Sequence, residues 1–221
     1  MTTASPLDQL LVAVDPGGRE SGIVVLYGEG LYAAAVLDRA VAVDPRHGYS
    51  AAAWAAANVE AVHRLASEAL TVVVPMLGLT EPIAASDLPR VRLAIENYHA
   101  PNPHVTRDDG DAIINLDGIL DTALVVGQLL GEWPDAILVE PGGNGALPPG
   151  RGHYPPPIDA RPGAAGRDRL RHARSAYDVA RAARGLAGRL HDEAHRAARV
   201  VEPVLYRAQL TRPTPSVGSN P

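Results

Sequence analysis

The first 43 residues contain three apolar, β-rich runs joined by short turns, and this arrangement restricts the fold most strongly. Residues 10–14 form a continuous apolar run that ends at Asp15-Pro16-Gly17-Gly18. Residues 21–27 and 31–43 follow, with Gly28-Glu29-Gly30 between them. A short apolar run that stops at a Pro/Gly turn is typical of a buried strand. Three such runs with tight connections predict an antiparallel meander.

The rest of the chain alternates between helical and strand-like patterns. Residues 51–70 are rich in Ala and place Trp54, Val62 and Leu65 near helical spacing, which predicts an amphipathic helix. The same reasoning predicts the later elements, which are strand 91–98, helix 113–130, strand 136–139 and helix 164–198. This order predicts an α/β fold. Its mixed five-stranded sheet has three antiparallel strands, then parallel strands, with helices on both faces.

A single domain is predicted for residues 1–200, since this length suits one well-formed core. The domain includes a Gly/Pro-rich loop at 141–162, which is too long for a simple connection and therefore has a functional role or is mobile. Residues 71–79 are apolar, and Glu81-Pro82 and Leu88-Pro89 then interrupt any regular element. Residues 201–221 are rich in Pro, Ser and Thr and are predicted to be a disordered tail.

Basic residues are concentrated in the C-terminal third of the chain. Residues 151–221 contain 13 Arg and 6 Asp or Glu, whereas residues 1–150 contain 7 Arg and 19 Asp or Glu. Such asymmetry is typical of a segment that binds a polyanion, although a solvated Arg-rich helix gives the same composition. All 20 basic residues are Arg, as expected for the GC-rich genome of a bacterium or phage. The choice of Arg over Lys therefore carries little functional weight.

Cysteine content and hydropathy exclude some classes of protein. The chain has no Cys, which excludes disulfides and thiolate metal sites. No apolar run approaches the roughly 20 residues of a membrane span, and no charged-then-apolar leader opens the sequence. We therefore expect a cytoplasmic protein with no membrane partner.

Three acidic residues stand at positions that favour a chemical role. Asp15 closes the first apolar run, Glu96 lies inside a later one, and Asp178 lies in the last predicted helix. An acid in a buried strand is costly unless it is paired or binds a cation. If the two strands are neighbours, Asp15 and Glu96 meet at one sheet edge, where Mg²⁺ or Mn²⁺ would offset their repulsion. Plainer roles stay open: Asp15 as a turn residue, Glu96 in an ion pair with Arg92, and Asp178 on a solvated helix face.

Three motifs in this order carry a resemblance to a known family. The chain reads Val-Ala-Val-Asp15-Pro-Gly-Gly at the first strand, Ala-Ile-Glu96-Asn-Tyr at the later strand, and Arg-His172-Ala-Arg-Ser175-Ala-Tyr-Asp178 in the last helix. Together they resemble the RuvC-type Holliday junction resolvases of the RNase H-like superfamily. The resemblance spans roughly residues 10–185 and leaves residues 71–90 as an insertion. It implies an RNase H-like fold and a metal-dependent endodeoxyribonuclease that hydrolyses branched DNA by a two-metal mechanism.

The last helix departs from the pattern of that family. The family usually pairs an acid or His with an Asp three residues later, followed by Ala. One register aligns His172 with Ser175 and puts Ser where the Asp belongs, and the other aligns Ser175 with Asp178. We favour Asp178 as the third metal ligand beside Asp15 and Glu96. His172 would then lie close by, to orient water or the scissile phosphate or to act as an acid–base group.

The resemblance also implies partners for the chain. A homodimer would act on a Holliday junction or related branched DNA, and the helix at 113–130 is apolar enough for a dimer face or for the core. Phosphate contacts that do not depend on base sequence are expected from arginines around the last helix. These are Arg167, Arg169, Arg171, Arg174 and Arg181.

Two other classes of protein fit parts of the sequence. Actin/Hsp70-type ATPases also place Asp and Gly after a first strand, but they need a second Asp-Gly loop, and ATP binding without DNA binding would favour them. A catalytically weakened RuvC-like DNA-binding or phage structural module would account for Ser175 and would bind junctions without cutting them. A nuclease for flaps, forks or packaging intermediates stays open as well, because the choice of substrate depends on dimer geometry.

Overall fold

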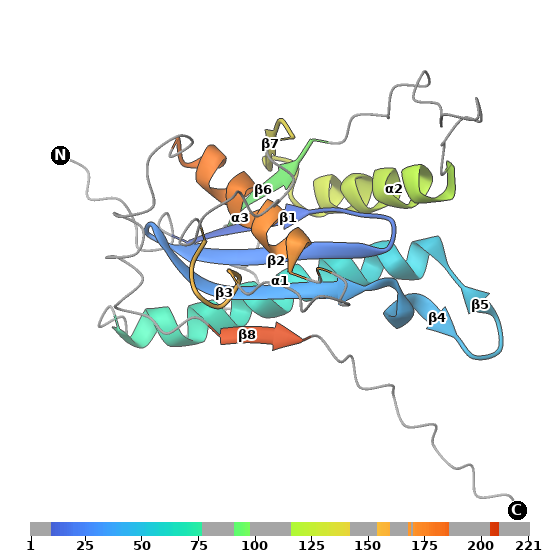
Figure 1. The fold of residues 1–221 in the computed structure, drawn as a ribbon, viewed down its shortest axis with the longest axis horizontal. Coiled ribbons are helices and arrows are strands. Elements are labelled where there is room, and N and C mark those ends of the chain that lie inside the picture. The colour runs from blue at the N-terminus through green and yellow to red at the C-terminus, as the bar shows by residue number, and fades with distance from the viewer. Residues whose placement is uncertain are drawn as a thin grey trace, which may run out of the picture.

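A computed structural model shows a mixed sheet with helices on both faces (Figure 1). The described residues are 10–76, 91–97, 116–141, 154–159, 168, 170–185 and 204–207. Within these residues the main sheet has six strands in the order β7-β6-β1-β2-β3-β8. A second sheet of two short strands, β4 (Val43–Asp44) and β5 (Gly48–Tyr49), follows β3 and a short 3-10 helix, η2 (Arg39–Ala42).

The pairing of the strands confirms the predicted fold class. β1 (Leu10–Asp15), β2 (Glu20–Tyr27) and β3 (Gly30–Asp38) are antiparallel neighbours. β6 (Arg92–Glu96) and β7 (Ile137–Val139) run parallel to β1 on its other side. Three antiparallel strands followed by parallel strands, with helices on both faces, are the RNase H-like arrangement that was expected.

A sixth strand extends the sheet beyond the five that were predicted. β8 (Val204–Arg207) pairs parallel with β3, where Ala33 faces Val204. The prediction that residues 201–221 form a disordered tail is therefore wrong for this segment. Its sequence Val-Leu-Tyr-Arg has the β-branched and aromatic residues that suit a strand. The prediction missed this strand because it was based on the Pro, Ser and Thr content of residues 201–221 as a whole.

In the described part of the chain, helices α1, α2 and α3 cover the two faces of the sheet (Figure 1). α1 (Ala51–Met76) and α2 (Leu116–Glu132) pack on one face, and α3 (Arg171–Ala183) packs on the other. α2 was expected to suit a dimer face or the core, and it buries Val125 and Leu129 but exposes Leu120 and Leu124. Among the described residues, no helix has the length and apolar character that are needed to cross a membrane.

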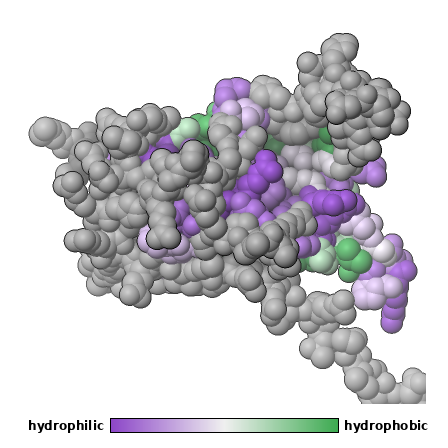
Figure 2. Space-filling view, in the orientation of Figure 1, coloured by the Kyte–Doolittle hydropathy of each residue, from purple (hydrophilic) through white to green (hydrophobic). Residues whose placement is uncertain are grey.

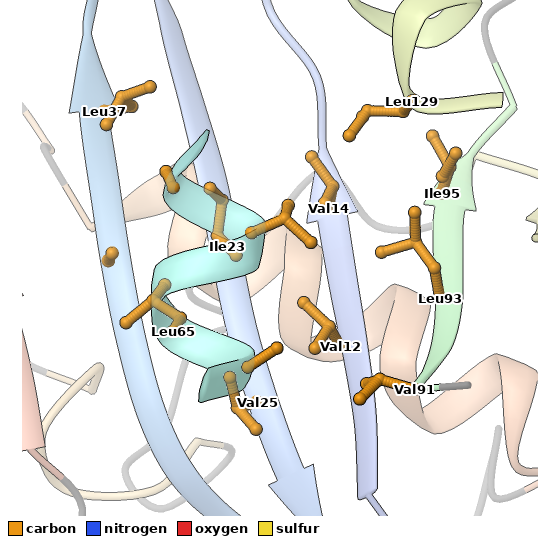
Figure 3. Close-up of a cluster of buried hydrophobic side chains, with 14 of the residues drawn as sticks. Val12, Val14, Ile23, Val25, Leu37, Leu65, Val91, Leu93, Ile95 and Leu129 are labelled. Carbon is orange, nitrogen blue, oxygen red and sulfur yellow. The ribbon is translucent and has the colours of Figure 1, made fainter. Parts of the chain in front are cut away.

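Alternation along the strands divides the apolar side chains between two cores. On β1, Val12 and Val14 belong to the core under α1 and α2, whereas Leu11 and Ala13 belong to the core under α3. Figure 3 shows the first core, in which aliphatic side chains of β1, β2, β3 and β6 pack together with α1 and α2. Because successive side chains of a strand point to opposite faces, Asp15 follows Ala13 onto the α3 face.

The turn after β1 is anchored from the α1 side by a buried tryptophan. Trp54 is fully buried, and its indole Nε1 donates to the backbone oxygen of Gly17 at 3.0 Å. At the other side of the turn, the backbone N–H of Gly17 donates to Ser21 Oγ at 3.3 Å. These bonds hold the turn, and with it the position of Asp15 at the end of β1.

Trp54→Phe is expected to lower the free energy of unfolding by roughly 2 kcal/mol, because a buried ring loses volume and the carbonyl of Gly17 loses its donor. Urea denaturation followed by circular dichroism measures the change. Trp133→Phe is the matched control, since it shrinks a similarly buried indole that faces His63 and lies away from this turn. Equal losses in the two variants would contradict a specific role for the bond to Gly17.

Candidate active site

Two acidic side chains lie side by side at the edge of the sheet. β1 and β6 are paired in parallel up to Val14 and Ile95, and Asp15 and Glu96 are the next residue on each strand. Each acid is only 8% exposed. Each lies two residues after an alanine of the α3-side core, Ala13 or Ala94, so both point to the α3 face. The predicted meeting of Asp15 and Glu96 on adjacent strands is therefore present in the structure.

Placing these carboxyl groups together changes the acidity of Glu96. Burial, a hydrogen bond with Asp15 and the negative charge of Asp15 raise the pKa of Glu96 to about 8. The hydroxyl of Ser175 opposes this rise by donating to Glu96 Oε2 at 3.3 Å. Two buried acids in this position cannot both carry a charge without cost unless a cation neutralises them.

α3 brings two further side chains to the acid pair. His172 Nδ1 lies 2.8 Å from Asp15 Oδ2, and Ser175 contacts Glu96. The helix comes this close because Gly22, the cross-strand partner of Asp15, has no side chain. A Cβ atom at Gly22 would stand 1.9 Å from the backbone oxygen of His172. Gly22 therefore determines the distance between α3 and the two carboxylates.

Asp178, the acid that was favoured as the third ligand, is bonded to Tyr154 and not to Asp15 or Glu96, although its negative charge contributes to the raised pKa of Glu96. Its Oδ2 accepts a hydrogen bond of 2.8 Å from the Tyr154 hydroxyl. Burial raises the pKa of Asp178, and the bond from Tyr154 and the charges of Arg181 and Arg174 oppose this rise. Residues six positions apart differ by about 120° around a helix. His172 and Asp178 therefore face different directions, and the structure brings together His172 and Ser175 of the other register.

A third buried acid near the pair was not identified from the sequence. Glu20, the first residue of β2, is 5% exposed and places its Oε2 3.9 Å from His172 Nε2. It shares the α3 face with Gly22 and Val24. An acid two residues before a glycine in an apolar strand was the available signal. It could be interpreted only with the knowledge that α3 covers this face.

The arginines expected to bind phosphate are in different environments. Arg174 is fully buried, donates to the backbone oxygen of Ile158 at 3.1 Å and forms an ion pair with Asp168. Arg181 is 9% exposed. Burial contradicts the prediction that these two side chains contact DNA. Arg171 is exposed. Figure 2 shows hydrophilic residues gathered near the centre of one molecular face. Arg167 and Arg169 lie outside the described residues.

The acid pair fits a hard divalent cation, although no larger ligand cluster is present. Among the described residues, no group of three or more His, Asp or Glu side chains is arranged to hold a metal ion. Mg²⁺ is commonly held by one or two carboxylates, with waters and substrate phosphates as the remaining ligands. Asp15 and Glu96 supply such a pair, and their mutual repulsion is the feature that a cation would remove.

Comparisons with known proteins add little to this geometry. A scan against protein-family models and a search of curated proteins each find no match. Among solved structures, the chain is similar to T. thermophilus RuvC in complex with a Holliday junction substrate. That similarity has a TM-score of 0.34 and 13% sequence identity, and it covers 80% of this chain and 97% of the other. The order and direction of the strands define the fold, and the contacts of the side chains define the site.

Proposed function

We propose that the chain is a metal-dependent, structure-specific endodeoxyribonuclease that acts on branched DNA. The observation that carries the proposal is the buried pair of Asp15 and Glu96 on adjacent parallel strands, with His172 and Ser175 held against it. The sequence motifs around these residues resemble those of RuvC-type resolvases, and this resemblance points to a Holliday junction or a related branched substrate.

The metal in this proposal is Mg²⁺ or Mn²⁺, held by Asp15 and Glu96. When bound, such an ion supplies Lewis-acid stabilisation of a phosphodiester and a more acidic water. The two-metal mechanism that the family resemblance implies would use a further acid on α3. Ser175 stands beside Glu96 instead, and Asp178 is bonded to Tyr154. We therefore assign the protein ligands to one cation.

The remaining side chains have roles that follow from their contacts. The ring of His172 is oriented by Asp15 through Nδ1 and serves to orient water or the scissile phosphate or to transfer a proton. Ser175 keeps Glu96 in place through its hydroxyl. Exposed Arg171 on the same helix is the described candidate for a phosphate contact, and a homodimer would present two such sites to two strands.

Cleavage of a synthetic four-way junction beside a linear duplex of the same sequence, with and without Mg²⁺, tests the proposal. We expect nicking of the junction that needs Mg²⁺ and little cleavage of the duplex. Salt should weaken binding to both DNAs, since phosphate contacts release counterions. Cleavage that is unaffected by chelation, or no cleavage with Mg²⁺ or Mn²⁺, would refute it.

Mg²⁺ is expected to raise the melting temperature of the protein without DNA. At ten times its dissociation constant the ion adds about 1.4 kcal/mol, which corresponds to roughly 3–6 °C for a chain of this size. Asp15→Asn should lose this shift, whereas Asp178→Asn should keep it because Asp178 is bonded to Tyr154. Thermal unfolding over a Mg²⁺ titration makes the measurement. Loss of the shift in Asp178→Asn would show that this acid is a ligand after all.

A second function is favoured by one observation, the hydroxyl of Ser175 at a position where an acid is expected. A weakened site of this kind suits a DNA-binding or phage structural module that holds junctions without cutting them. The same junction assay separates the two functions, because binding without cleavage in either metal supports the module. Restored cleavage in Ser175→Asp would then identify Ser175 as the cause.

A further inference from the structure

We infer that Glu20 is a positioning residue of the active site, which fixes the ring of His172 from the side opposite Asp15. This inference rests on the proposed function, since it concerns the same site. It assigns a role to a buried acid that the sequence motifs do not include. Glu20 would act through His172 and not by direct contact with DNA or metal.

The first support is the position of the imidazole between two acids. Nδ1 of His172 lies 2.8 Å from Asp15 Oδ2, and Nε2 lies 3.9 Å from Glu20 Oε2. Both ring nitrogens therefore face a carboxylate, so that a flip or rotation of the ring would remove one or both of these contacts.

The second support is the burial of Glu20. Its side chain is 6% exposed, and a carboxylate that is removed from water to this extent needs a charged or hydrogen-bonding partner. Among the contacts of α3, the Nε2 atom of His172 is a polar group that lies beside this carboxylate, at 3.9 Å from Oε2.

The third support is that β2 positions the backbone of His172 as well as its ring. Glu20 and Gly22 are two residues apart and share the α3 face of the strand. A Cβ atom at Gly22 would meet the backbone oxygen of His172, and one at Gly17 would stand 3.5 Å from its Cε1 atom. The side chain of His172 thus lies against the turn between Asp15 and Glu20, and Glu20 lies beside its Nε2 atom.

The experiment compares Glu20→Gln with the wild type in two independent measurements. Long-range ¹H–¹⁵N spectra at one fixed pH report the ring nitrogens of His172, assigned among the 8 histidines from a His172→Gln sample. Single-turnover and steady-state cleavage of the four-way junction report kcat and KM. We expect the His172 nitrogen signals to change, and kcat to fall roughly tenfold while KM stays within about twofold.

Asp121→Asn is the matched control, because it removes a similarly buried acid that pairs with Arg39 at 3.4 Å outside the site. Its His172 signals and kcat should equal those of the wild type. If Glu20→Gln does not fold, Glu20→Asp replaces it, since it keeps the charge but withdraws the carboxylate by one methylene. That variant should shift the same signals by a smaller amount.

The outcomes separate this inference from the proposed function. His172 signals that are unchanged in the folded Glu20 variant overturn the positioning role, whatever the cleavage result. Changed signals in Glu20→Gln, together with a wild-type protein that cuts no DNA, support the positioning of His172 and refute the nuclease. Changed signals with an equal loss of kcat in Asp121→Asn overturn the inference, because removal of any buried acid would then have the same effect.

Discussion

Asp15→Asn and Glu96→Gln should each reduce Mg²⁺-dependent cleavage of a four-way junction by at least about 100-fold, since loss of even an outer partner of a metal site costs 10–100-fold. Each variant removes one of the two carboxylates that meet at the ends of β1 and β6. DNA binding should be unchanged or stronger, because less negative charge then faces the phosphates. Single-turnover cleavage and gel-shift titration in Ca²⁺ measure the two effects separately.

The control for this prediction is again Asp121→Asn, which should cut at the wild-type rate because Asp121 pairs with Arg39 outside the site. Glu96→Gln carries a second expected effect that needs no DNA. In EDTA its free energy of unfolding should increase by roughly 1 kcal/mol, because a neutral amide replaces an acid that is forced against Asp15. A variant of either acid that cuts at the wild-type rate would remove the basis for the proposed nuclease.

Strand patterns in the sequence predicted the fold well, because apolar runs ending at turns specify buried strands without much context. β1, β2 and β6 fall within one or two residues of their predicted positions. The limits of α1 were harder to predict. The helix was expected to end at residue 70, yet it continues to Met76 through Thr71–Val74, whose β-branched residues favour strands by intrinsic propensity.

The position of the site residues on the strands could be predicted from the sequence, whereas the position of those on α3 could not. Side chains alternate between the two faces of a sheet along each strand. Asp15 and Glu96 therefore lie on one face once β1 and β6 are neighbours in this register. His172, Ser175 and Asp178 are spaced three apart, so the sequence allowed two registers on α3. The rotation of the helix is set by its close approach to Gly22, which no local pattern of α3 reveals.

The buried charges show a similar limit of the sequence. Arg174 was expected to contact DNA phosphate, and Arg is rarely buried without a partner. Its partners are Asp168 and the backbone of Ile158, and the second of these lies in the Gly/Pro-rich loop 16 residues away. Such a contact depends on how the loop returns to α3, and composition does not determine that path.

Gly22→Ala is expected to cost about 3 kcal/mol of folding free energy, because overpacking against backbone cannot be relieved by a change of rotamer. The added Cβ would stand 1.9 Å from the backbone oxygen of His172 and 2.7 Å from the nitrogen of Ala173. α3 must therefore move away from β2, and it would carry His172 and Ser175 away from their acids. Urea denaturation measures the loss, and the Mg²⁺-induced rise in melting temperature reports whether the acid pair persists.

Gly127→Ala in α2 is the matched control, since the same methyl group there has no atom within 4 Å. Because Ala is a better helix former than Gly, this variant should gain about 0.5–1 kcal/mol. Replacing Gly by Ala is thus expected to lower the free energy of unfolding at position 22 and to raise it at position 127. Only Gly22→Ala should alter the ring signals of His172. If Gly22→Ala is as stable as the wild type and keeps those signals, α3 does not lie against β2 at this glycine. The assembly of His172 and Ser175 on the acid pair would then need another cause.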